Sequence, residues 1–164
     1  MEVVIFPPMV KKHVNTIEIK NKKAFHDYVV GDTFDAGIVL QGTEVKSVKL
    51  GNAQIKEAFV RVDRKGTLVL FNAQIDEYAF GNLENHEPKR QRSLLLHRRE
   101  IRKIRNAIER EGFSAIPLKM YVFHGLVKVK FALCKGKKLY DKRHDLRQRT
   151  ELREAERFLA HRHR

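Results

Sequence analysis

Apolar and polar residues alternate through the middle of the chain, which is the pattern of strands that bury one face. The clearest run extends from Val127 to Phe131, where every second residue is apolar and the residues between them are lysines. Between two other runs, Arg64-Lys65-Gly66 predicts a tight hairpin turn. The expected strands, with breaks at Gly31-Asp32 and Gly125, cover residues 25–30, 34–40, 54–63, 67–79, 117–124 and 126–134.

Two segments have the helical period instead. Residues 44–50 are followed by Gly51, so a short helix with a glycine cap is predicted there. Residues 93–111 place leucines and isoleucines on one side and arginines on the other, which predicts a longer helix capped by Ser93 and ended by Gly112. About six strands, with a helix inserted before the last pair, predict a mainly β chain with some α. The expected architecture is a small antiparallel barrel like that of OB-type nucleic-acid binders.

The two ends of the chain lack this pattern. Residues 1–16 contain two adjacent prolines and no clear period, so a loose arm is expected before a barrel that spans residues 17–140. Residues 141–164 carry a thin helical stripe around Leu152 and Leu159 among many charges. So little apolar surface does not offset backbone ordering at about 1–2 kcal/mol per residue. This basic tail is expected to be disordered when free and helical against RNA; a helix docked on its own barrel is the alternative.

Charge indicates the kind of partner. The 164 residues include 34 Lys and Arg against 20 Asp and Glu, a net charge of +14. Residues 1–92 hold 14 basic and 12 acidic residues, whereas residues 93–164 hold 20 and 8. This imbalance predicts a polyanionic partner bound on a defined face. A solvated basic surface without a partner is the alternative.

Nothing in the sequence indicates export or a membrane span. No apolar run approaches the ~20 residues of a transmembrane helix. The N-terminal VVIFPPMV lacks the basic region and the cleavage site of a secretory signal. Cys134 is the single cysteine, which excludes an internal disulfide and fits a reducing compartment. A soluble, cytoplasmic protein is therefore expected.

The sequence contains no motif for catalysis. Its eight histidines form no HExxH, and there is no CxxC, phosphate-binding glycine loop or GxSxG. His26 lies near three aspartates, but alternation would divide these residues between the two faces of a strand pair. We expect no enzyme activity, no cofactor and no metal. An RNA-processing enzyme is the alternative, and activity that depends on added divalent metal would support it.

Aromatic rings beside these charges favour RNA as the polyanion. Tyr140, for example, stands between Lys137-Lys138 and Lys142-Arg143. Base stacking on a ring contributes about 1–3 kcal/mol per base, and the cations add phosphate binding that weakens with salt. A ribosomal protein or an initiation-factor-like OB domain would also fit. A membrane-surface protein that uses the basic helix is disfavoured, because the apolar side of that helix is needed for the barrel.

Five short blocks carry a resemblance to a known family. They occur in the family's order and spacing, and they resemble the signature blocks of the SsrA-binding protein family, also called small protein B. The resemblance covers roughly residues 17–157. The blocks are NKKAFHDY at 21–28, GTEVKS at 42–47, NHEP at 85–88, SLLLHRRE at 93–100 and KGKKLYDKR at 135–143.

The resemblance implies a function in ribosome rescue. Such a protein binds the tRNA-like domain of transfer-messenger RNA and, with elongation factor Tu, delivers it to ribosomes stalled on messages that lack a stop codon. The tail would then form a helix in the empty mRNA channel. The implied partners are transfer-messenger RNA, the ribosome and, through the aminoacylated RNA, elongation factor Tu. A monomer that contacts no membrane is expected.

The resemblance also implies roles for individual residues. Asp35 stands where the family usually has Glu, and the shorter carboxylate reaches about one methylene less. The residues expected to bind RNA are Asn21, Lys22, Lys23, His26, Tyr28, Asp35, Lys46, Lys135, Gly136, Lys137 and Lys138. The residues expected at the ribosomal decoding centre and mRNA channel are Tyr140, Asp141, Lys142, Arg143, Arg147, Arg149, Arg153, Phe158 and Leu159.

Overall fold

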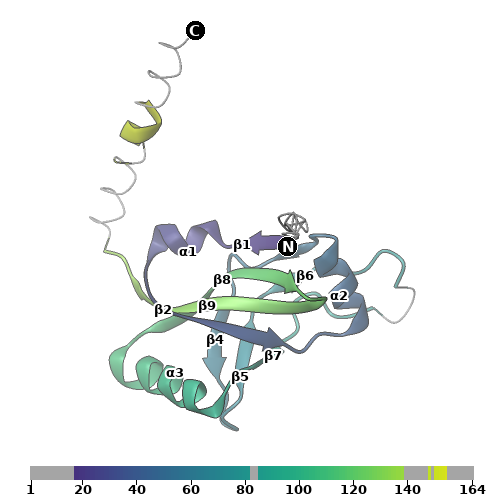
Figure 1. Cartoon of the computed structure of the whole chain (residues 1–164), viewed down its shortest axis with the longest axis horizontal. Coiled ribbons are helices and arrows are strands. Elements are labelled where there is room, and N and C mark those ends of the chain that lie inside the picture. The colour runs from purple at the N-terminus through teal and green to yellow at the C-terminus, as the bar shows by residue number, and fades with distance from the viewer. Residues whose placement is uncertain (1–16, 82–84, 139–147, 149, 155–164) are drawn as a thin grey trace, which may run out of the picture.

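A computed structural model describes residues 17–81, 85–138, 148 and 150–154 of the chain. Strands dominate this part (Figure 1). The strands are β1 (Glu18–Lys20), β2 (Tyr28–Ile38), β3 (Ala53–Gln54), β4 (Phe59–Val62), β5 (Leu68–Phe71), β6 (Gln74–Ile75), β7 (Arg92–Leu95), β8 (Ser114–Phe123) and β9 (Leu126–Gly136). The helices are α1 (Lys22–Asp27), α2 (Gly42–Lys49) and α3 (Arg98–Glu111), and residues 148 and 150–154 are also helical.

Six of the strands close into an antiparallel ring. Their order is β8-β4-β5-β7-β2-β9, and β9 pairs again with β8. β1 adds to the outside of β8, while β3 and β6 form a separate two-stranded sheet. The predicted fold class, mainly β with about six antiparallel strands, one long helix and one short helix, is therefore confirmed. Helix α1 is an additional short helix.

The predicted alternation places the core inside this ring. In β9, Val127, Val129 and Phe131 are buried, as the lysine-spaced pattern requires. The Phe131 ring stacks on that of Phe34 from β2, with the ring centroids 5.5 Å apart. Each fully buried side chain of this size stabilises the fold by about 1.5–3 kcal/mol, so this interior supplies the main driving force for closing the ring.

The turn between β8 and β9 follows from two residues. His124 and Gly125 both have positive φ, of 48° and 80°. Phe123 and Leu126 face each other directly on either side of them. Two consecutive residues with positive φ are the requirement of a two-residue hairpin that matches the twist of its strands. The predicted junction at Gly125 is confirmed, and so is the turn that contains Gly66, where the Asp63 N–H donates to the Thr67 carbonyl at 2.7 Å.

The prediction of a helix that begins at Ser93 was wrong. Residues 92–95 form β7, and α3 begins only at Arg98, where His97 and Glu100 form a capping box. Leu94 is buried because it pairs with Leu68 of β5 and Ile38 of β2. A run of three leucines fits the period of a helix or of a buried strand. Pairing with β5 on one side and β2 on the other therefore determines that these residues form a strand. The end of the helix at Gly112, with φ 68°, was predicted correctly.

The prediction of a strand from residue 25 was also wrong, because residues 22–27 form α1. Ala24 of this helix is buried against Ile116, Leu118 and Cys134, in a small second core on the outer side of β8 and β9. β2 then runs through the expected break at Gly31, where the register shifts. A Cβ at Gly31 would lie 2.8 Å from the Leu133 carbonyl oxygen, so the close approach of the two strands requires glycine.

The two long strands expected before the leucine run are each divided. The 54–63 segment forms β3 and β4, and the 67–79 segment forms β5 and β6. Between β5 and β6, Asn72 has φ 54°, a conformation that ends a strand. The short pieces β3 and β6 pair with each other outside the ring, next to α2.

Candidate RNA interface

Two segments of the predicted interface, more than a hundred residues apart in sequence, lie together at one end of the ring. Tyr28 at the start of β2 pairs with Gly136 at the end of β9. The Lys137 N–H donates to the Asp27 carbonyl at 2.9 Å, which joins the end of α1 to the segment after β9. The structure thus brings residues 22–28 and 135–138 into one surface, which we call the α1 platform (Figure 1).

The side chain of Asn21 holds the beginning of α1 in place. Its side chain accepts from the Ala24 N–H at 3.1 Å and donates to the carbonyls of Ile55 and Pro117 at 3.1 and 3.0 Å. The residue is 1% exposed, and both donor hydrogens and the acceptor are used within the protein. Asn21 is thus an N-cap that positions the cations of α1, and the RNA contact predicted for it stays a prediction.

The side of α1 that faces solvent carries cationic side chains. Lys22 is exposed, and Lys23 forms an ion pair with Glu57 at 2.6 Å that raises the pKa of the lysine. His26 Nδ1 lies 2.9 Å from a carboxylate oxygen of Asp27. Between them Phe25 is 47% exposed, although no strand or helix period marks it as a surface residue. An exposed ring flanked by cations suits base stacking, so Phe25, an aromatic residue beside charges in the 21–28 block, is a candidate contact.

The end of β9 supplies the other half of the platform. Lys135 places its ammonium 4.6 Å from the centre of the Phe113 ring. Gly136 faces open space, so backbone packing does not require a glycine there. The Lys137 ammonium donates to the Phe25 carbonyl at 3.2 Å, which ties it to the end of α1. Lys138 is exposed and, within the described residues, its ammonium makes no ion pair or hydrogen bond.

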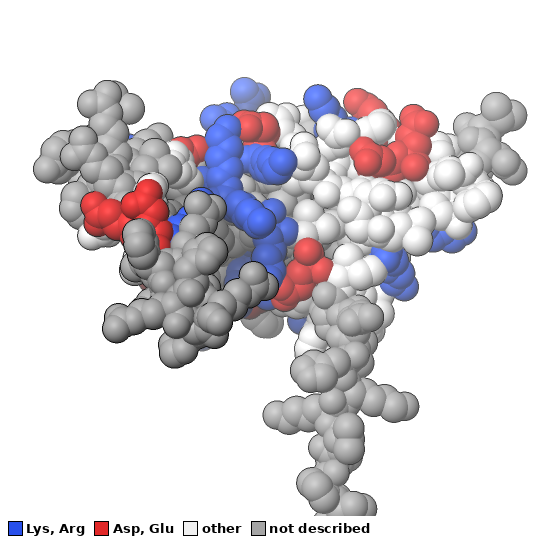
Figure 2. Space-filling view, turned by 90° about the horizontal axis from the view of Figure 1, so that it is seen from above, with Lys and Arg blue, Asp and Glu red and all other residues white. Residues whose placement is uncertain are grey.

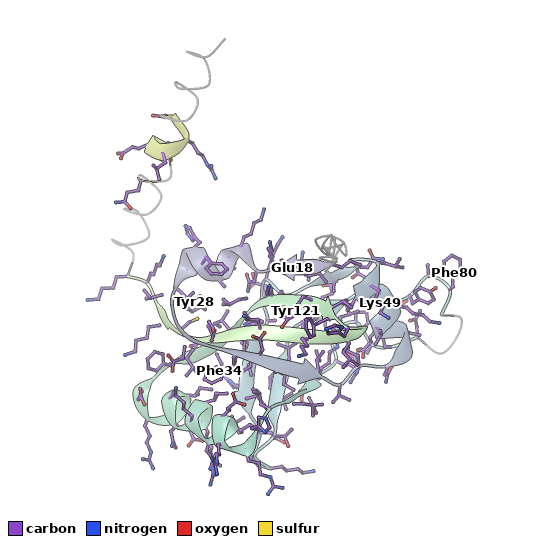
Figure 3. All side chains as sticks on the ribbon, viewed as in Figure 1. Glu18, Tyr28, Phe34, Lys49, Phe80 and Tyr121 are labelled. Carbon is purple, nitrogen blue, oxygen red and sulfur yellow. The ribbon has the colours of Figure 1, made fainter. Side chains whose placement is uncertain are left out.

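Asp35 lies outside the α1 platform. It is seven residues beyond Tyr28 on β2, or roughly 23 Å along the strand. Its carboxylate accepts from the Tyr121 hydroxyl at 2.8 Å and pairs with Lys130 at 3.1 Å. The pKa of Tyr121 is raised to about 12. Burial is the largest cause, and the hydrogen bond to Asp35 and the negative charge of that carboxylate add to it. Figure 3 shows Tyr28 and Tyr121 at separate positions along the ring.

More residues extend this second surface, which we call the outer strip and define as Asp35, Lys119, Tyr121, Lys128 and Lys130. The Lys119 ammonium lies 4.8 Å from the Tyr121 ring centre and pairs with Glu18 at 2.7 Å. Lys128 lies 4.9 Å from the Phe123 ring centre, and Phe123 is 49% exposed. Alternation along β2, β8 and β9 turns all of these side chains away from the core, so the strip offers both rings and ammonium groups.

Lys46 lies on α2, at the opposite end of the ring from α1 (Figure 1). It is exposed, and its ammonium stands 5.1 Å from the centre of the Tyr78 ring. Its neighbour Glu44 is completely buried and bonded to Arg90 and Arg92. The 42–47 block therefore holds a structural carboxylate beside an exposed cation, and Lys46 does not adjoin the α1 platform.

Most of the predicted decoding-centre residues lie outside the described part. Arg153 is the exception; it is helical and exposed. Beside it, Leu152 is 64% exposed. Those outside the described residues are Tyr140, Asp141, Lys142, Arg143, Arg147, Arg149, Phe158 and Leu159.

Basic and acidic side chains share the face that carries α1 and β1. Figure 2 shows lysine and arginine side chains gathered near the middle of this face, with acidic side chains beside them. Within residues 17–81, 85–138, 148 and 150–154, no three His, Cys, Asp or Glu side chains gather as metal ligands would. The same residues include no helix long and apolar enough to cross a membrane.

Cys134 is buried, and burial raises the pKa of its thiol, so it is a poor nucleophile.

Comparison with known proteins gives consistent matches. The family model described as SmpB protein matches residues 18–161. The chain is 49% identical over 140 residues to the SsrA-binding protein of Oceanobacillus iheyensis, covering 85% of this chain and 90% of that protein. It is 49% identical over 134 residues to the SsrA-binding protein of Geobacter sulfurreducens, covering 82% and 87%. A solved chain from "tmRNA-SmpB: a journey to the center of the bacterial ribosome" superposes with a TM-score of 0.64 at 40% identity, covering 75% of this chain and 86% of that one.

Proposed function

Since the chain belongs to the SmpB family of SsrA-binding proteins, we propose that it binds the tRNA-like domain of transfer-messenger RNA and delivers this RNA to stalled ribosomes in trans-translation. Its partners are transfer-messenger RNA and the ribosome. The chain is an RNA-binding protein, and it acts by binding alone, without catalysis. It works in the cytoplasm as a monomer, and elongation factor Tu joins through the aminoacylated RNA.

The α1 platform is the observation that carries this proposal. Two segments that are each basic by sequence meet through the pairing of Tyr28 with Gly136, and they surround the exposed Phe25 ring. Ammonium groups bind phosphates and the ring stacks on an unpaired base, which is how proteins recognise RNA loops. The outer strip extends the contact along the ring, with Tyr121 held in place by Asp35. The tail that follows Lys138 contacts the ribosome.

A competition gel shift at physiological salt tests the function. Labelled tRNA-like domain of the cognate transfer-messenger RNA is bound by the chain and then displaced with unlabelled transfer-messenger RNA or with an elongator tRNA. We expect the elongator tRNA to compete at least about a hundredfold less well, a difference of about 2.7 kcal/mol. Equal competition by the two RNAs would show a basic RNA-binding protein without this specificity.

We propose different roles for the two neighbouring lysines that follow β9. Lys138 is free to meet a phosphate, so Lys138→Met should weaken RNA binding and reduce the slope of log K against log salt by about 0.7–0.9. Lys137 already donates to the Phe25 carbonyl, so Lys137→Met should weaken binding with an unchanged salt slope, because it loosens α1. Fluorescence titrations of the RNA from about 50 to 200 mM salt measure both values. A reduced slope for Lys137→Met would instead make it a phosphate contact.

A further inference from the structure

A row of exposed apolar side chains crosses the outer face of the ring at the end that carries the β8–β9 turn. Phe123 and Leu126 face each other on the two sides of this turn. Val39, the residue after β2, continues the row. Because Gly37 of β2 pairs with Lys128 of β9, the residue two positions further along β2 lies opposite Leu126. Three neighbouring strands therefore place apolar side chains side by side outside the ring.

Strand β7 adds a fourth side chain to this row. Leu95 pairs with Gly37, and a Cβ at Gly37 would lie 3.4 Å from the Leu95 Cβ, so the glycine leaves room for the leucine. Leu94 is buried in the core, and the alternation of the strand therefore turns Leu95 outward. The four side chains are between 48% and 67% exposed. We call this set the apolar row and define it as Leu95, Val39, Leu126 and Phe123.

The apolar row is not part of the interior that closes the ring. Its side chains lie on the face opposite the core, where their contact with water is unfavourable. None of the four carries a charge and only Phe123 carries a ring, so the row is unsuited to phosphates and offers little to bases. Contiguous apolar surface outside a sheet marks a site that another segment or molecule covers.

The N-terminal arm meets the described part of the chain beside this row. Residues 1–16 lie outside the described residues, and Ile17 is the first residue within them. The Val122 N–H donates to the Ile17 carbonyl at 3.3 Å, so the arm joins the ring next to Phe123. Residues 3–10, with the sequence VVIFPPMV, are all apolar. An uncharged apolar segment is therefore only a few residues in sequence from an exposed apolar surface.

We propose that residues 3–10 pack across the apolar row and shield it from water. The linking residues 11–16 span up to about 20 Å when extended. The row crosses three strand spacings, about 14 Å, and eight extended residues cover about 25 Å. Pro7 and Pro8 fix φ at a value that suits an extended backbone, and they lack N–H groups. The segment therefore lies across the strands through side-chain contacts, without adding a strand to the sheet.

Photo-crosslinking of the full chain tests this placement. Phe6→p-benzoylphenylalanine puts a photoreactive ring in the middle of the segment, and irradiation links this ring to C–H bonds that it touches. We expect links within one molecule, on tryptic peptides that contain Val39, Phe123 or Leu126, with a yield independent of protein concentration. Mass spectrometry of the monomer band identifies these peptides.

Variants of the row separate docking from chance contact. Val39→Ser, Leu126→Ser should lower the yield of these links at least about fivefold, because two apolar contacts are lost. The matched control is Leu50→Ser, Phe80→Ser, which removes two exposed apolar side chains outside the row and should change the yield by less than about twofold. Circular dichroism verifies that both double variants are folded.

Dye binding gives a second measurement that does not depend on the photoreactive residue. Nile red is an uncharged dye that fluoresces on exposed apolar surface. Deleting residues 2–10 should raise its fluorescence at least about twofold, because the row is then uncovered. Adding Val39→Ser, Leu126→Ser to the deletion should reverse this rise.

Three outcomes would overturn the proposal. Links found only in a dimer band would assign the row to a second copy of the chain. Links that the row variant and the control variant reduce equally would leave the segment without a defined site. Unchanged dye fluorescence after deletion of residues 2–10 would show that the arm does not cover the row, which would then be open to another protein. None of these measurements uses RNA, so failure of the transfer-messenger RNA assignment would be detected separately by the gel shift.

Discussion

Ending the chain after Arg143 is expected to leave its affinity for transfer-messenger RNA within about twofold and to reduce tagging on stalled ribosomes to background. The α1 platform and the outer strip precede this point, so every cation proposed to hold the tRNA-like domain is retained. The truncation removes residues 144–164, a segment of 21 residues in which arginines and a few apolar side chains follow a helical pattern. In the described turn of this segment Leu152 is 64% exposed, which supports a tail available to the ribosome.

Gel shifts with the tRNA-like domain and a reconstituted translation reaction on a message without a stop codon measure the two effects. The matched control carries residues 144–164 in scrambled order, so that charge and composition stay constant while the helical pattern is lost. If the scrambled tail restores tagging, charge alone is sufficient. Loss of RNA affinity on truncation would contradict the proposed division of roles.

The second large effect concerns stability: Glu44→Gln should lower the free energy of unfolding by about 3–5 kcal/mol. Glu44 is completely buried and accepts from Arg92 Nε at 2.9 Å and from the Gln41 N–H at 2.6 Å. Arg90 binds both carboxylate oxygens. Without the carboxylate, the fully buried Arg92 guanidinium loses its counter-charge. Urea denaturation followed by circular dichroism gives the free energy of unfolding.

Glu57→Gln is the matched control for this variant. Glu57 forms an ion pair of similar length with Lys23, at 2.6 Å, but its side chain is 73% exposed. Exposed pairs contribute only about 0–1 kcal/mol because water screens them. A loss for Glu44→Gln no larger than for Glu57→Gln would contradict the assigned role of the buried carboxylate.

The pH dependence of the unmodified chain provides a check that does not require the variant to fold. Burial by itself raises the pKa of Glu44, but the hydrogen bonds from Arg90, Gln41 and Arg92 outweigh it, and the pKa lies below its ordinary value of 4.5. The folded state therefore binds the proton less tightly than the unfolded state. The stabilisation is complete above pH 4.5 and is lost as the pH falls through the folded-state pKa. The free energy of unfolding of the unmodified chain should accordingly fall as the pH is lowered through the folded-state pKa of Glu44.

This buried network shows what residue order alone does not reveal. Glu44 and Arg92 are 48 residues apart, and nothing in their neighbours marks either as buried. Arginine and glutamate are charged residues that a sequence pattern assigns to the surface. The remaining donors of Arg92 are satisfied by the carbonyls of Ala73, Pro88 and Arg90, and only the folded chain brings the carbonyl of Ala73 beside it.

Sequence by itself determined the features with a local physical cause. Alternating lysines and apolar residues defined β9, because a strand turns successive side chains to opposite faces. Residues that tolerate positive φ defined the turns at Gly66 and Gly125 and the end of α3 at Gly112. The excess of cations in residues 93–164 indicated a polyanionic partner, aromatic residues beside them favoured RNA, and five blocks in order indicated the family.

Tertiary structure decided the features that depend on distant partners. Residues 92–95 became a strand because β5 and β2 pair with both of their edges, and residues 22–27 became a helix because Ala24 covers Ile116 and Leu118. Asn21 was predicted to face RNA, and its amide also donates to the carbonyls of Ile55 and Pro117. The α1 platform exists only because the ring closes Tyr28 onto Gly136. Such contacts join residues dozens to more than a hundred positions apart, and local propensity contains no information about which of them will meet.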